Sequence, residues 1–209
     1  MKNFLIVTTS FLLIGCSSEH NKDGALVSVK KIPEITVNDY IYTLGEVTIK
    51  WTAFKHSAKA QVGGKFKSAA VKGFTESTNL STAISGVTFK IPVASTSTND
   101  EVRDYKIVNS FFNTMVDTDS ILGRILSIDE NGSGKLVINM NGKEIEKKYK
   151  WEMDQTSKEI YLKTSIDVLN WGAQSSLDAL NEVCLEQHTG PDGKNVLWPN
   201  VDITVIVDL

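Results

Sequence analysis

The chain has 209 residues, 41% of them hydrophobic, which is enough for one domain with a buried core. A net charge of −3, with no basic stripe interleaved with aromatics, excludes a typical nucleic-acid-binding protein. The three histidines (His20, His56 and His188) lack metal-ligand spacing, and no Gly-x-Ser-x-Gly turn or phosphate loop occurs. We therefore expect a non-enzyme that requires no metal or cofactor. An enzyme such as a hydrolase is the weakest hypothesis.

The first fifteen residues have the features of a secretory signal. Lys2 precedes a mostly apolar run over 4–14, which is too short to span a bilayer. The sequence Leu-Ile-Gly-Cys at 13–16 resembles the lipobox of bacterial lipoproteins. This resemblance implies cleavage before Cys16 and attachment of a diacylglyceryl group to its sulfur. The alternatives are an ordinary signal peptide and a buried strand that ends in Gly-Cys.

Residues 16–40 begin with a polar stretch that predicts a flexible tether. The residue after Cys16 is Ser17, not the Asp that favours inner-membrane retention in many lipoproteins. We therefore expect lipid anchoring in a bacterial cell envelope, on the periplasmic side of the outer membrane rather than at the inner membrane. The predicted organisation is a signal peptide at 1–15, a lipidated tether at 16–40 and one domain at 41–209.

Strand patterns dominate after the tether. Apolar and polar residues alternate over 47–53, where Phe54 falls on the face opposite Trp51 unless a bulge intervenes. Gly63-Gly64 predicts a bulge or sharp bend, and Asn141-Gly142 predicts a two-residue hairpin turn. The further predicted strands cover 60–74, 87–93, 121–128, 136–140, 145–153, 160–166 and 201–207.

Two stretches have helical spacing instead. Apolar residues recur every four positions over 100–115, and a second apolar face over 175–187 includes Cys184. Ser175 or Ser176 is the expected N-cap of the second helix. We expect Cys184 to be a small buried apolar residue rather than a reactive thiol.

These patterns predict an all-β fold, in which strands with one wet and one buried face form an antiparallel sheet. Closing such a sheet removes its exposed edges. We predict an antiparallel, lipocalin-like, eight-stranded barrel with one or two short helical insertions. A barrel of this size is either filled by its own side chains or holds one small ligand. Strand periodicity does not distinguish these two cases.

Four segments occur in a recognisable order: the strand pair ending in Gly-x-Phe at 47–66, the segment 97–104 with its downstream Phe pair, 166–172 and 198–203. Together they resemble the YceI-like proteins, which are lipocalin-like barrels of the bacterial envelope. The resemblance covers roughly 47–207. Two departures occur, because the usual Arg of the third segment falls on Val168 or Leu169, and the usual Thr-x-His-Gly reads Asn-Met-Asn-Gly.

The resemblance implies a tunnel that holds a polyisoprenoid, a quinone-like lipid or a fatty-acid or fatty-amide chain. Arg103 and Asp104 are the polar candidates for a head group at the mouth, and a structural ion pair or a helix cap is their alternative role. His56 is a weaker head-group candidate. Trp171 and Trp198 are expected to pack a barrel end. The lining candidates, each also a candidate for plain core, are Trp51, Phe66, Phe89, Phe111, Phe112, Met115, Tyr149 and Trp151.

The expected partners are therefore a long-chain apolar ligand and, through Cys16, a membrane. Association with a second copy of the chain, as a homodimer, is an additional alternative. The alternative function is a structural or interaction module of the envelope, with a filled barrel and no cargo.

Overall fold

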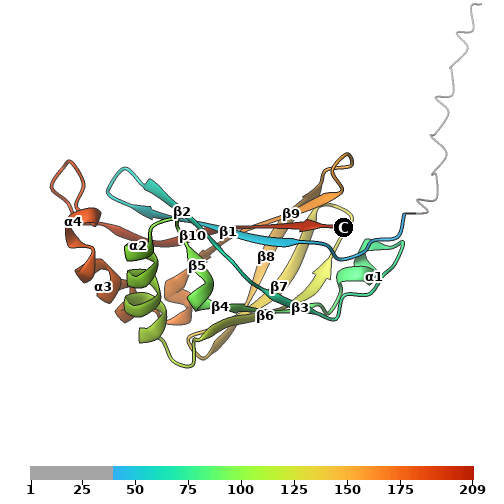
Figure 1. Cartoon of the computed structure of the whole chain (residues 1–209), viewed down its shortest axis with the longest axis horizontal. Helices are drawn as coiled ribbons and strands as arrows, with labels where there is room; N and C mark the ends of the chain where they lie inside the picture. Colours follow the sequence, from blue (N-terminus) through green and yellow to red (C-terminus); the bar gives the residue numbers. More distant parts are fainter. Residues whose placement is uncertain (1–39) are drawn as a thin grey trace, which may run out of the picture. The chain divides into compact units, whose positions relative to one another are not determined.

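The computed structural model describes residues 40–209. The predicted signal peptide, Cys16 and the tether up to residue 39 lie outside the described residues. Ten strands dominate the described part (Figure 1). They are β1 (Val47–Lys55), β2 (Ala60–Phe66), β3 (Ala70–Lys72), β4 (Thr88–Pro92), β5 (Thr96–Ser97), β6 (Ser120–Ile128), β7 (Ser133–Met140), β8 (Lys143–Met153), β9 (Glu159–Asp167) and β10 (Leu197–Asp208).

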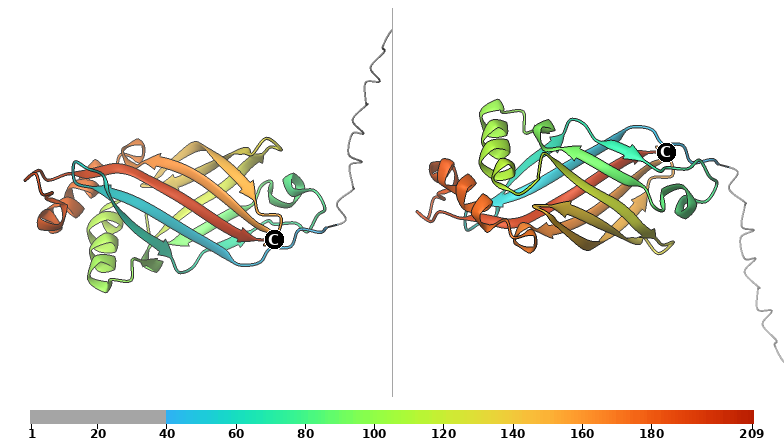
Figure 2. Two further views of the ribbon diagram at one scale, coloured as in Figure 1. Left: turned by 90° about the horizontal axis from the view of Figure 1, so that it is seen from above. Right: turned by 90° about the horizontal axis from the view of Figure 1, so that it is seen from below.

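The helices are short and lie at the two ends of the sheet. Views from above and below place α2, α3 and α4 at one end, and α1 with the C-terminus at the other (Figure 2). No helix within 40–209 is long and apolar enough to cross a membrane. The helices are α1 (Leu80–Ile84), α2 (Glu101–Lys106), α3 (Gln174–Val183) and α4 (Leu185–His188), with helical turns η1 (Val93–Ser95), η2 (Ile107–Phe111), η3 (Phe112–Thr114) and η4 (Val168–Trp171).

All ten strands form one antiparallel sheet in the order β3-β4-β6-β7-β8-β9-β10-β1-β2-β5. Eight of them contain five residues or more, which confirms the predicted antiparallel fold. The other two, β3 and β5, have three and two residues and occupy the two ends of the sheet. Strands of two or three residues are too short to show an alternation of apolar and polar side chains. The sequence therefore predicted only the eight longer strands.

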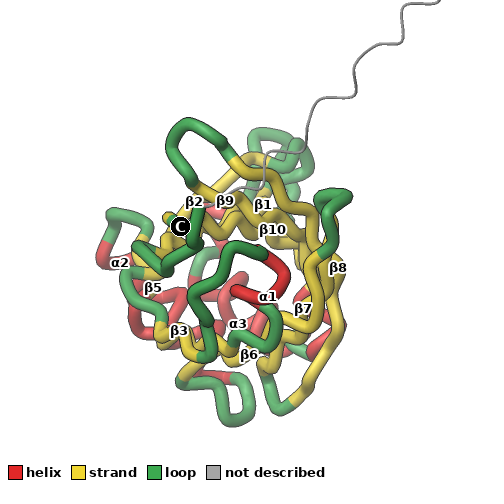
Figure 3. The backbone as a smooth tube through the Cα atoms, turned by 90° about the vertical axis from the view of Figure 1, so that its right-hand side faces the viewer, coloured by secondary structure: helices red, strands yellow, loops and turns green. Residues whose placement is uncertain are grey.

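The sheet curls round on itself, and the chain connects its two ends directly. β2 and β3 belong to opposite ends of the strand order, yet only residues 67–69 separate them in the chain. The Lys67 N–H donates to the Ser95 carbonyl at 2.8 Å, which ties this segment to η1 between β4 and β5. Viewed from the end, the strands follow a ring (Figure 3).

The predicted bulge at Gly63-Gly64 is wrong, because β1 and β2 pair without a register shift. Gly64 instead lies opposite Trp51 and accommodates its ring: a Cβ on Gly64 would lie 2.3 Å from Trp51 Cζ2. A glycine in a strand can mark such a close approach as well as a bulge.

One other local prediction is confirmed, and one condition left open by the sequence is met. Asn141 and Gly142 have φ angles of 52° and 67° and join β7 to β8 as a tight two-residue turn. The pairing of β1 with β10 shifts register between Ala53 and Lys55. Because of this bulge, Trp51 and Phe54 can both face the barrel interior.

The helical segment at 100–115 is also confirmed, as α2, η2 and η3 in succession. Asp100 is the N-cap of α2 and accepts from the Arg103 N–H at 3.0 Å. The predicted N-cap of the second helix is wrong: α3 begins after Ala173, which makes no side-chain cap. Ser176 is buried instead, and its hydroxyl accepts from Thr114 Oγ1 at 2.8 Å. That bond joins α3 to η3.

Candidate ligand-binding cavity

The barrel encloses a cavity of about 290 Å³, which we call the barrel cavity. Its lining includes β10 residues from Leu197 to Val207, ten residue steps, or about 33 Å of strand at the usual rise. The volume is at the lower edge of the range for small-molecule sites. Because this small volume is spread along a long wall, the barrel cavity is a narrow tunnel. Such a shape suits an extended chain better than a bulky ring system.

Most residues predicted to bind a ligand reach this cavity. The shared feature of the aromatic ones is that they come from strands or from the η2–η3 segment. Phe54, Trp198 and Cys184 also line the cavity, together with many Val, Ile and Leu side chains that the sequence did not single out. The predicted residues in the lining are Trp51, Phe66, Phe89, Arg103, Phe111, Phe112 and Tyr149.

Asp104, Met115 and Trp151 lie outside the lining, which corrects their predicted position. The Asp104 carboxylate accepts from the Thr98 N–H at 2.7 Å and the Thr98 hydroxyl at 2.6 Å, a structural contact that is neither of the expected alternatives, an ion pair or a helix cap. Met115 is packed in the hydrophobic core. The Trp151 indole donates to the Asp129 carbonyl at 2.8 Å, at the turn that joins β6 to β7.

Three cavity aromatics share one packing arrangement. Each lies directly across from a glycine in the neighbouring strand, and its ring covers that glycine. A Cβ on the glycine would come within 2.1 to 2.3 Å of the ring. The rings therefore lie along the wall and leave the middle of the barrel open. The pairs are Trp51 with Gly64, Phe89 with Gly123, and Tyr149 with Gly134.

Tyr149 presents its ring to the cavity while its polar atom is satisfied elsewhere. The phenol donates to the Ser127 carbonyl at 2.9 Å. Burial, and then the charge of Asp129, raise the pKa of Tyr149 above its ordinary value. The side chain is therefore neutral at physiological pH and contributes apolar surface to the cavity.

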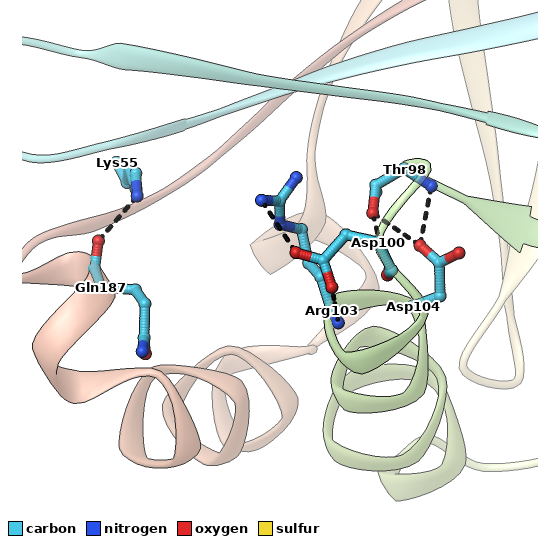
Figure 4. Close-up of polar contacts among 6 residues, drawn as sticks. All are labelled: Lys55, Thr98, Asp100, Arg103, Asp104 and Gln187. Carbon is cyan, nitrogen blue, oxygen red and sulfur yellow. Dashed lines mark hydrogen bonds and ion pairs between the residues drawn. The ribbon is translucent and has the colours of Figure 1, made fainter.

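Charged side chains line the cavity at the end that carries α2, α3 and α4. Arg103 forms an ion pair with Asp100 at 3.3 Å, with 45% of its side chain exposed. Lys55 Nζ donates to the Gln187 carbonyl at 2.8 Å, and Figure 4 shows both contacts. Lys106 Nζ donates to the Val183 carbonyl at 2.8 Å. We call Lys55, Arg103 and Lys106 the basic cluster.

His188 also lines this end, and it is neutral. Burial, followed by the charges of Lys55, His56 and Lys106, lowers the pKa of His188 to about 4. Its Nδ1 lies 2.8 Å from Asn181 Oδ1. His56 lies outside the lining, with Nε2 3.0 Å from the Gln187 carbonyl, so the head-group role considered for it receives no support from its position.

The two tryptophans expected at a barrel end differ in their surroundings. Trp171 is fully buried, and its indole donates to the Ile138 carbonyl at 3.2 Å. Trp198 lines the cavity, donates to the His56 carbonyl at 2.8 Å, and has Lys59 Nζ 4.3 Å from its ring centroid. Within residues 40–209, no three His, Cys, Asp or Glu side chains gather to hold a metal ion.

No protein-family model matches the chain, and no curated protein matches it. Solved structures do. A polyisoprenoid binding domain from Saccharophagus degradans aligns with a TM-score of 0.54 and 11% identity, over 77% of this chain and 91% of that domain. Burkholderia cenocepacia BcnA gives 0.52 and 10%, over 77% and 94%. This protein has the YceI-like fold.

A YCEI protein from Campylobacter jejuni aligns with a TM-score of 0.47 and 15% identity, over 75% of this chain and 88% of that protein. The YceI-like fold accounts for the position of the barrel cavity, since a barrel of about eight strands has room for one small ligand along its axis.

Proposed function

We propose that the protein binds a long apolar molecule, of the polyisoprenoid or fatty-acid and fatty-amide type, in the barrel cavity. The observation that carries this proposal is the lining, which is almost wholly aliphatic and aromatic along its length. Each 100 Å² of apolar ligand surface removed from water contributes about 2.5 kcal/mol. A cavity that is already open lets most of that contribution appear as affinity, because little has to be ordered on binding.

The similar domain from Saccharophagus degradans, a polyisoprenoid binding domain, supports this ligand class. The narrowness of the cavity supports a linear chain. An open cavity of about 290 Å³ argues against the alternative of a structural module whose barrel is filled by its own side chains. The role proposed for the bound lipid is storage, transport or protection against stress.

Mass spectrometry under non-denaturing conditions tests this function on protein purified from its own host. We expect a fraction of molecules with an added mass equal to one long-chain lipid, which disappears on denaturation and is recovered in an organic extract. If the protein carries no such mass, and takes up neither isoprenoid nor fatty chains when they are supplied, the proposed function is wrong.

We further propose that the domain at 41–209 is held in the bacterial envelope, at the periplasmic face of the outer membrane, by lipid on Cys16. The support is the lipobox-like sequence at 13–16 together with Ser17. An acylated anchor places a binder of membrane lipids beside its source, and multiple acyl chains make such anchoring stable.

The anchor is tested by metabolic labelling with radioactive palmitate. We expect label in the wild-type chain and none in Cys16→Ser, which should also lose its cleavage at residue 15. Cys184→Ser is the matched control and should label like the wild type, because Cys184 is buried inside the barrel domain. Equal labelling of the Cys16→Ser variant would show that the chain is not a lipoprotein.

A further inference from the structure

The charged side chains in the cavity lining are all positive. Within the described part of the chain they are the three residues of the basic cluster; His188, Tyr149 and Cys184 also line the cavity, and no Asp or Glu does. Lys55 ends β1, Arg103 and Lys106 lie on α2, and His188 ends α4. These elements meet at one end of the barrel (Figure 1). An apolar cargo alone would need no such group.

The charges of the basic cluster are only partly neutralised. Lys55 and Lys106 each donate one hydrogen bond to a main-chain carbonyl near the ends of α4 and α3, and these carbonyls carry only partial negative charge. An ammonium has three donors, so both lysines retain donors for a ligand. Arg103 has an exposed carboxylate partner in Asp100, and its guanidinium offers five donors.

Asp100 pairs with Arg103, but the carboxylates of α3 and α4 do not pair with the basic cluster. The α3 and α4 residues Asp178, Glu182 and Glu186 form none of the ion pairs found in residues 40–209, and none of them lines the cavity. The lowered pKa of His188 has Lys55 and Lys106 among its causes, in agreement with a net positive potential at this end.

The opposite end of the cavity is apolar. Phe74, Ile84 and Val87, on and beside α1, line it there. The lining is therefore asymmetric along its length, with cations at one end and hydrocarbon at the other. A ligand with the same asymmetry would satisfy both ends at once, because an anion gains charge-assisted hydrogen bonds only at the cationic end.

We propose that the cargo is an amphiphile with an anionic head group, a carboxylate or a phosphate, whose head contacts the basic cluster and whose chain runs toward Phe74 and Ile84. This inference rests on the proposed function and deepens it. The basic cluster then fixes the direction in which the chain lies, and it selects acidic lipids over neutral lipids of equal length.

Matched ligand pairs test the inference on the delipidated full-length protein at pH 8, by calorimetric titration. The pairs are oleate with oleyl alcohol and farnesyl phosphate with farnesol. We expect at least one anion to bind about tenfold or more tightly than its neutral partner, since a hydrogen bond to a charged group contributes about 1.5–3 kcal/mol. The pair that shows the larger preference identifies the head group as carboxylate or phosphate.

The double variant Arg103→Gln/Lys106→Gln should lose this preference, so that each anion binds no more tightly than its neutral partner. Glutamine keeps an N–H donor at position 106 and removes the charge. Lys55→Gln provides a second variant, with a smaller loss. Lys135→Gln is the matched control, because Lys135 pairs with Glu146 on the outer wall and should not alter either affinity.

Equal binding of anionic and neutral partners by the wild type, or tighter binding of the neutral ones, overturns the inference and leaves the proposed function standing. A preference that survives in the double variant and in Lys55→Gln overturns it as well. Binding of none of the four ligands, with no lipid in protein from the host, contradicts the proposed function itself.

Discussion

Replacing Gly64 with alanine is expected to weaken cargo binding by about tenfold or more. The new Cβ would lie 2.3, 2.6 and 2.9 Å from three atoms of the Trp51 ring. Contacts that short do not persist, so the ring must turn away from the wall. Trp51 lines a narrow cavity, and its indole would then occupy space that the ligand needs. Titration of oleate or farnesyl phosphate into the delipidated protein measures the loss.

Gly63→Ala is the matched control for this prediction. Gly63 adjoins Gly64 in β2, so both substitutions change backbone entropy and strand propensity alike. The nearest atom to a Cβ on Gly63 is the Trp51 carbonyl oxygen at 3.9 Å, which is an ordinary contact. We expect Gly63→Ala to bind like the wild type. Unchanged affinity in both variants would show that ring placement by Gly64 does not keep the cavity open.

Trp171→Ala is expected to lower the free energy of unfolding by about 3–5 kcal/mol, the usual cost of removing a large buried aromatic. The side chain has no exposed surface, and its indole donates to Ile138. Its main-chain carbonyl accepts from the Asn141 side chain at 2.8 Å, which links η4 to the β7–β8 turn. Chemical denaturation of the delipidated protein measures the change without a contribution from bound lipid.

Trp171→Phe is the comparison for this second prediction. It retains most of the buried volume and removes the indole donor, so we expect a smaller loss than with alanine. Trp171 lies outside the cavity lining, so the cargo affinity of whatever fraction remains folded should be that of the wild type. A loss below about 1 kcal/mol for Trp171→Ala would mean that η4 does not hold the barrel end together.

The strands and tight turns could be predicted because their causes are local. The alternation in β1 and the Asn141-Gly142 turn depend on neighbouring residues, and both appear as expected. The bulge between Ala53 and Lys55 was not predicted: the alternation places Trp51 and Phe54 on opposite faces, and the sequence does not show that both line the cavity.

The candidate site was only partly predictable, because periodicity assigns a face and not a position along the barrel. Tyr149 and Trp151 share a face of β8, yet only Tyr149 lines the cavity. The role of Gly64 depends on its partner across the sheet, which local sequence does not specify. The basic cluster combines Lys55 with two residues of α2 about fifty positions later, and nothing in the local sequence connects them.

The most direct measurement is a crystal structure of the protein purified from its host without removal of lipid. The proposed function predicts continuous, elongated density inside the barrel that contacts Trp51 and Phe89 and runs between the α1 end and the basic cluster. A barrel interior without such density, or one in which the Trp51 and Phe89 rings have left Gly64 and Gly123 and closed the cavity, would contradict it.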